Sequence, residues 1–230
     1  MATGDLDKSA FQHYVGQDFV YLGFFMRAYE LTLAKCEGEG MAELNPCSGL
    51  HATTTTTTTA NTTTQNALLQ VREALSGFIE GVRVEMGVQV GYAASWGVEL
   101  SEVEASPATL AYTGFLIEVA SSPDTSVAHV FAAMAPCARL YAFLACQLAG
   151  AHGGTWHASP YAHWIASYSA REYLDLPALS ERLLDGMGTD ADEGALAALY
   201  ARAMVLELAF FDAQPLGLGK GGAEGGLEAA

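Results

Sequence analysis

Signals for helix starts recur along this 230-residue sequence, and no stretch shows the sustained polar–apolar alternation of β-branched residues that marks a strand. Ser106–Pro107 and Ser159–Pro160 each place a capping hydroxyl before a proline, which suits the first turn of a helix. The segments between such signals are long and apolar. The sequence therefore predicts an all-α chain of about seven helices, with several of them apolar enough to form the buried layer of a bundle.

The boundaries of the expected helices follow from the apolar runs and their caps. They cover residues 11–35, 66–96, 107–120, 126–150, 161–170 and 177–186, and a last helix that follows the cap at 189–192 and ends at Ala213. The threonine run at 45–65 is poor in helix formers and has no apolar period, so we expect a disordered surface insertion there. The Gly-rich segment 217–230 is expected to be a flexible tail. One helical domain would then span 1–216.

Composition narrows the class of function. Hydrophobic residues make up 51% of the chain and charged residues 16%, which is enough apolar material for a substantial core. The 26 acidic residues outnumber the 10 basic ones, for a net charge of −16. Such a chain repels nucleic acid and anionic membrane surfaces, so we expect neither as a partner.

Metal, phosphate and membrane motifs are missing from the sequence. The four cysteines match no zinc pattern and no redox pair, and the six histidines form no HExxH or Glu-x-x-His pair. The most membrane-like stretch, 126–154, carries His129, Arg139 and Gln147, which favours a buried helix. No signal peptide is visible, so a cytoplasmic location without metal or organic cofactor is the simplest interpretation.

Carboxylates on apolar helix faces are the informative residues, because a bundle should bury few of them. Glu207 lies in ALYARAMVLELAFF, where desolvation should raise its pKa and suit it to acid–base chemistry. A structural carboxylate bonded to a tyrosine is an equal alternative. Asp18 shares a face with Tyr14, Tyr21 and Phe25, a setting for a flat heteroaromatic ligand or simply a wet helix face.

Cys137 follows Pro136 inside a long helix, where the proline can open a cleft. Tyr141 lies one turn further on the same face, whereas Cys146 lies on the opposite face, so at most one of the two cysteines belongs to such a cleft. A buried thiol is more often a small core residue than a nucleophile. The stripe Tyr161, Trp164 and Tyr168, and also Tyr112, are equally typical of a core.

Taken together, several stretches resemble the TenA family, the thiaminase II or aminopyrimidine aminohydrolase group with a haem-oxygenase-like fold. They are FQHYVGQDFVYLGFFMRAYEL, PATLAYTGFLIEVA, MAPCARLYAFL, SPYAHWIASYS and LELAFFDAQPL, in the family's order. The Pro-Cys and closing blocks look most like the TenA domain of plant and algal bifunctional thiamin-salvage enzymes. The family begins with a further helix before the position of Phe11, which is expected to be missing here. At a usual histidine the chain has Gln89, while Glu85 is kept.

The resemblance implies roles for individual residues. Cys137 matches the nucleophile of the cysteine-bearing branch, Glu207 the glutamate that contacts a pyrimidine ring nitrogen, and Asp18 the aspartate that binds the aminopyrimidine. The tyrosines that match pocket positions are Tyr21, Tyr112 and Tyr141, together with Tyr168, for which Tyr161 is the alternative.

The function implied is hydrolysis of 4-amino-5-aminomethyl-2-methylpyrimidine, or of thiamin, to the hydroxymethylpyrimidine by cysteine catalysis in thiamin salvage. The partner would be this small-molecule aminopyrimidine substrate, and the family implies a homo-oligomer, a tetramer. Two alternatives stay open. One is a non-catalytic aminopyrimidine-binding or scaffold protein, and the other is the same fold with an oxidase chemistry, which the missing histidine set disfavours.

Overall fold

The computed structural model describes residues 1–43, 57–151, 153–187 and 192–215. Within these ranges the chain forms helices and no strand, which confirms the predicted all-α class. The elements are α1 (Lys8–Glu43), α2 (Thr57–Ser95), η1 (Leu100–Glu102), α3 (Pro107–Ser121), α4 (Val127–Ala151), η2 (Thr155–Ala158), α5 (Ala162–Ser169), α6 (Arg171–Met187) and α7 (Glu193–Asp212). Residues 1–7, which precede α1, form turns.

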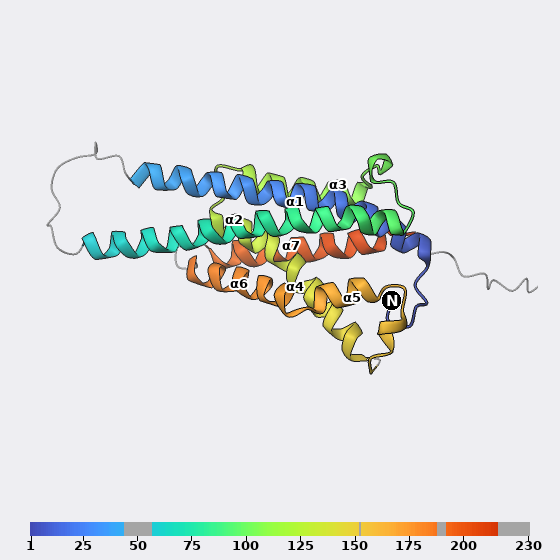
Figure 1. Ribbon diagram of the computed structural model, residues 1–230. Coiled ribbons are helices and arrows are strands. Elements are labelled where there is room, and N and C mark those ends of the chain that lie inside the picture. The colour runs from blue at the N-terminus through green and yellow to red at the C-terminus, as the bar shows by residue number, and fades with distance from the viewer. Residues whose placement is uncertain (44–56, 152, 188–191, 216–230) are drawn as a thin grey trace, which may run out of the picture.

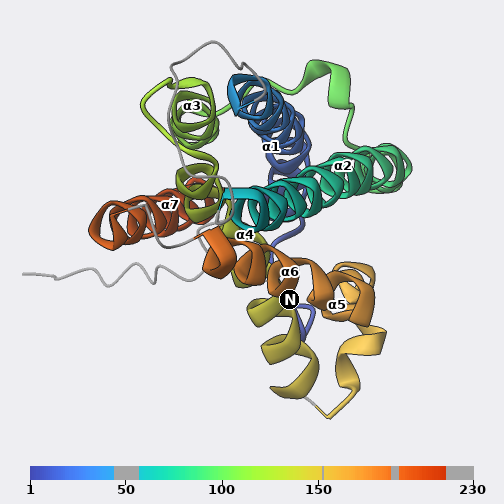
Figure 2. The ribbon, with the colours of Figure 1, turned by 90° about the vertical axis from the view of Figure 1, so that its left-hand side faces the viewer.

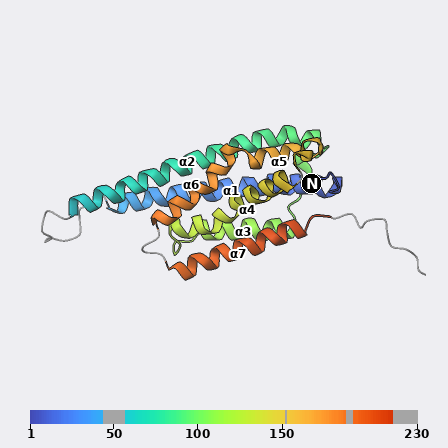
Figure 3. The same ribbon diagram turned by 90° about the horizontal axis from the view of Figure 1, so that it is seen from below.

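The helices pack as a bundle in which α4 contacts α3, α5, α6 and α7. The long helices α1 and α2 lie side by side and project beyond the others at the end where α1 finishes and α2 begins (Figure 1). Seen end-on, α1 and α2 lie on one side of α4, and α5 and α6 lie on another (Figure 2). From below, α3 and α7 run next to each other along the edge opposite α2 (Figure 3).

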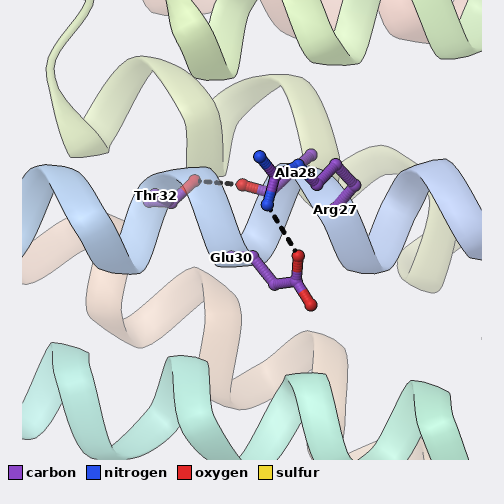
Figure 4. Close-up of polar contacts among 4 residues, drawn as sticks. All are labelled: Arg27, Ala28, Glu30 and Thr32. Atoms are coloured by element: carbon purple, nitrogen blue, oxygen red, sulfur yellow. Dashed lines mark hydrogen bonds and ion pairs between the residues drawn. The ribbon is translucent and has the colours of Figure 1, made fainter.

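Helix α1 shows how a long helix buries one face and exposes another. The fully buried Thr32 donates its hydroxyl to the Ala28 carbonyl at 2.7 Å, so its polar atom is satisfied inside the helix (Figure 4). Arg27 points to the other side and pairs with Glu30 at 2.9 Å. This surface pair adds little stability, and the packing of the buried face holds the helix in place.

The caps predicted for two helices are present. The Ser106 hydroxyl accepts a hydrogen bond from the Thr109 amide at 3.1 Å at the start of α3. Asp192 caps α7 by accepting from the Gly194 amide at 2.9 Å. A further contact fixes α3 against α1: the buried Gln17 side chain accepts hydrogen bonds at the start of α3.

Several boundaries differ from the sequence prediction, and α1 extends beyond the predicted range 11–35 at both ends. Helix α2 begins at Thr57, so the prediction of a disordered insertion is wrong for residues 57–65; extending an existing helix costs far less than nucleating one. The rest of that insertion up to residue 56, and the tail 217–230, lie outside the described residues. Helix α6 begins at Arg171, so the buried Pro177 lies within it and does not start it. Helix α5 begins at Ala162, and Ser159–Pro160 belongs to the preceding turn.

Two apolar clusters fill the bundle, and they meet at Cys137, which packs against both. One cluster centres on Leu75, Leu116 and Val130, and the other on Phe11 and Ile165. Helices α4 and α7 each have the length and hydropathy of a membrane-spanning helix, but 61% of the apolar window of α4 is buried inside the bundle. A helix buried in this way is what the core of a bundle requires.

Candidate active site

A cavity opens where the two clusters meet, and α1, α2, α4, α5 and α6 form its walls. Five of the predicted site residues line it: Asp18 and Tyr21 from α1, Cys137 and Tyr141 from α4, and Tyr168 from α5. The remaining wall is largely apolar and aromatic, with Phe25, Tyr29, Phe78 and Tyr173 among its residues. A flat apolar enclosure with a few converging polar groups is the usual form of a small-molecule site.

Glu207 does not line this cavity itself, but its carboxyl interacts with Cys137, which does. Glu207 is 1% exposed, which confirms that the apolar pattern of α7 marks a buried carboxyl. The Tyr112 hydroxyl donates to Glu207 Oε1 at 2.9 Å, and the Cys137 thiol lies within hydrogen-bonding reach of the same carboxyl. The predicted residues Glu207, Tyr112 and Cys137 therefore form one connected group.

The proton affinities in this group are shifted by burial. Desolvation raises the pKa of Glu207 to about 7, although the Tyr112 and Cys137 hydrogen bonds act to lower it. Burial raises the pKa of the Cys137 thiol well above its ordinary range, and the charge of Glu207 raises it further. At neutral pH the thiol therefore keeps its proton, and Glu207 is near the midpoint of its titration, where it can both take and give a proton.

Asp18 occupies the wall of the cavity on α1. It accepts a hydrogen bond from Gln89 Nε2 at 2.7 Å and a longer one from the Tyr141 hydroxyl at 3.5 Å. Burial, followed by the nearby charge of Glu85, raises the pKa of Asp18 to about 7. Bound N–H donors would favour its charged form, so the site suits an amidine or aminopyrimidine edge.

Glu85 on α2 is a cavity residue that the sequence did not single out as functional. Its Oε1 accepts a hydrogen bond from the Tyr168 hydroxyl at 2.8 Å, and burial raises its pKa. In the sequence it lies three residues after Val82, on the same face as the buried Leu75 and Phe78, and the resemblance marks it as a residue that is kept.

The choice between Tyr168 and Tyr161 is clear in the structure. Tyr168 lines the cavity, whereas Tyr161 lies in the other part of the aromatic cluster, stacked on Trp96 with ring centroids 5.4 Å apart. The Tyr161 hydroxyl donates to the Leu6 carbonyl at 2.5 Å and does not line the cavity. Cys146 is exposed and also absent from the lining, as the helical-face argument predicts.

One polar atom in the cavity lacks a partner. The buried Tyr21 hydroxyl makes no hydrogen bond of standard geometry with any described residue, although it lies near Cys137 and Tyr112. Such an atom is ready to bond a ligand. Among the described residues, no group of three or more His, Cys, Asp and Glu side chains is arranged to hold a metal ion.

The structure is an all-helical bundle in which Cys137 and Asp18 line one aromatic cavity and the buried Glu207 carboxyl interacts with the cysteine. The model of the TENA/THI-4/PQQC family matches residues 58–214, more than half of the chain, and the chain belongs to that family. The resemblance of the sequence blocks is thereby confirmed.

Relatives and solved structures agree with this assignment. The chain is 28% identical to an aminopyrimidine aminohydrolase from Halalkalibacterium halodurans, covering 92% of this chain and 83% of the relative. It is 28% identical to the mitochondrial bifunctional TH2 protein of Arabidopsis thaliana over 94% of this chain, but spans only 33% of that protein.

Among solved structures, a TenA family transcription regulator from a Silicibacter species has a TM-score of 0.68 at 23% identity, with 91% of this chain and 83% of that chain covered. A TenA homologue from Pyrococcus furiosus has the same TM-score at 17% identity, with 90% and 84% covered. These structural matches establish the fold.

Proposed function

We propose that this protein hydrolyses 4-amino-5-aminomethyl-2-methylpyrimidine, or thiamin, to the hydroxymethylpyrimidine, with Cys137 as nucleophile. The observation that carries the proposal is that Cys137 and Asp18 line one cavity walled by aromatic rings, while the buried Glu207 carboxyl interacts with the Cys137 thiol. The aminopyrimidine aminohydrolase among the relatives supports the substrate class.

The proton positions support an order of events. The Cys137 thiol is protonated in the resting protein and lies beside the Glu207 carboxylate. Glu207 takes the thiol proton and passes it to a ring nitrogen while the sulfur adds to ring carbon C6. This covalent step breaks the aromaticity of the ring, which lowers the barrier to departure of the amine from the exocyclic methylene. Water then adds to the methylene and the thiolate is expelled.

Asp18 would hold the substrate during these steps. Its carboxylate accepts hydrogen bonds from the amino group and ring edge, and Tyr141 and Gln89 fix its orientation. The rings of Tyr21, Phe25 and Tyr168 enclose the flat ligand. No step in this sequence requires an electron acceptor.

The test compares two cysteines on one helix. Purified wild-type protein should release ammonia from the aminomethylpyrimidine, Cys137→Ser should lose nearly all turnover yet keep binding the hydroxymethylpyrimidine, and Cys146→Ser should stay close to wild type. Ammonia release and calorimetric binding are the measurements. Binding without turnover in the wild type would instead support a non-catalytic aminopyrimidine-binding protein.

A further inference from the structure

A second, smaller cavity lies between α2 and α5, on the other side of the residues that bound the substrate cavity. Asp18, Glu85 and Tyr168 line both cavities and so form the wall between them. The far side of the small cavity is lined by His163 and Ser167, which are exposed to solvent. The small cavity thus extends from the surface to the back of two carboxyl groups.

The small cavity is built to hold water. Two of its lining residues carry buried polar atoms without a protein partner in the described parts of the chain, Gln89 Oε1 and Tyr92 Oη. Buried polar groups in native proteins are almost always paired, and water is the usual partner where the protein supplies none. These two atoms therefore mark positions for water molecules behind the wall.

We propose that Glu85 is a catalytic residue that activates the hydrolytic water, which reaches the substrate through this small cavity. The inference rests on the proposed function and adds a base to it. Of the carboxyls at the site, Glu207 is engaged with the Cys137 thiol and Asp18 with Gln89. Glu85 accepts only the Tyr168 hydroxyl at Oε1, and no hydrogen bond to Oε2 is formed by the described residues.

The step balances with the groups present. The aminomethyl group of the substrate enters as its ammonium form, so when the C–N bond of the exocyclic methylene breaks, neutral ammonia leaves with the bonding electrons. The water oxygen forms a bond to the methylene carbon, and one water proton goes to the Glu85 carboxylate. Glu85 then returns this proton to the departing ammonia as ammonium. The C–S bond breaks, the ring regains its aromaticity, and the ring-nitrogen proton returns through Glu207 to the Cys137 sulfur.

The surroundings of Glu85, in the wall between the two cavities, affect its pKa. Burial raises the pKa of Glu85, and the Tyr168 hydrogen bond acts to lower it. The charged and titratable side chains around Glu85 are Asp18, Tyr14, Tyr168 and Tyr173, together with Tyr92 and His163 of the small cavity.

The experiment uses Glu85→Gln, which keeps the shape and can still accept the Tyr168 hydrogen bond. Steady-state turnover should fall by roughly 10²-fold or more, as expected when a general base is lost. Because amine departure precedes water attack, the variant should still release one equivalent of ammonia per chain in a burst. Intact-protein mass spectrometry should then show the pyrimidine attached to Cys137. The matched control, Glu80→Gln on the exposed side of the same helix, should behave like wild type.

A second measurement separates catalysis from structure. Azide is an anion that needs no deprotonation, so it should attack the methylene in Glu85→Gln and restore turnover with an azidomethylpyrimidine product. Turnover within tenfold of wild type would overturn the proposal. So would a slow variant that shows neither burst, adduct nor azide product, because its defect would lie in folding or binding. An inactive wild-type protein would remove the proposed function and this inference together, whereas an active wild type with a fully active Glu85→Gln would remove this inference alone.

Discussion

Glu207→Gln should stabilise the protein while it abolishes efficient turnover, and the gain in stability should grow with pH. The folded protein binds the Glu207 proton up to a pKa of about 7, whereas the unfolded chain releases it near the ordinary value of 4.5. Between these values the folded state holds more protons, so ionisation of Glu207 lowers stability as pH rises. Glutamine has no charge to desolvate and can still accept the Tyr112 hydrogen bond.

The magnitude follows from the two pKa values. At about 1.36 kcal/mol per pH unit, the cost of burying the charge is about 1 kcal/mol at pH 5 and about 3 kcal/mol at pH 8. The free energy of unfolding of Glu207→Gln, relative to wild type, should therefore rise by about 2–3 kcal/mol between pH 5 and pH 8.

Urea denaturation of both proteins at pH 5, 6, 7 and 8 measures this difference, with tryptophan fluorescence as the probe. The same samples assayed for ammonia release should show turnover lower by roughly 10²-fold or more. A stability difference that does not change with pH would refute the reasoning, because it would mean that Glu207 titrates alike in the folded and unfolded states. Such a gain in stability with loss of activity is common when a functional site contains a strained charge.

Two further changes test neighbouring contacts. Tyr112→Phe removes a hydrogen bond that favours the Glu207 anion. Because hydrogen bonds to charged groups are strong, the limb of the pH–rate profile that reports Glu207 should move upward by about one pH unit or more. A limb that does not move would show that another group is responsible for it. Gln17→Leu leaves the Ser106 amide without its acceptor and the Glu104 carbonyl without its donor, while the Thr109 hydroxyl keeps the Ser106 hydroxyl as a partner. The free energy of unfolding should therefore fall by about 2–4 kcal/mol in urea denaturation, and a loss below 1 kcal/mol would show that water replaces the side chain.

The residues that could be predicted from the sequence are those whose chemistry conflicts with their surroundings. Glu207 and Asp18 are carboxylates among apolar and aromatic residues, and the structure buries both. The Ser106–Pro107 cap was predicted because both residues act within one helical turn, and it starts α3 where expected. The resemblance of the sequence blocks added the proposed role of Cys137 as nucleophile, which a lone cysteine could not suggest.

The site residues that could not be predicted are those whose position depends on which side of a helix faces inward. On α2, Glu85 and Gln89 line cavities while Val84, Val88 and Val90 are more than half exposed, at 58%, 54% and 53%. The buried apolar residues of α2, which include Leu75, Phe78 and Val82, recur at helical spacing, and Glu85 and Gln89 continue that stripe. The exposed valines between them obscure this face in the sequence. The prediction that a helix starts at Pro177 was wrong for a related reason. Tertiary packing holds this proline inside α6 despite the lost hydrogen bond.

The buried thiol has a consequence for the chemical resistance of the protein. Oxidants and alkylating agents react with thiolates, and Cys137 is held as a neutral thiol by its surroundings when no ligand is bound. Among the three described cysteines, Cys146 on the same helix is the exposed one and the first that such reagents would meet. In the proposed mechanism Cys137 acquires its charge only when a bound ring accepts a proton, so it would be spared from peroxide damage between turnovers.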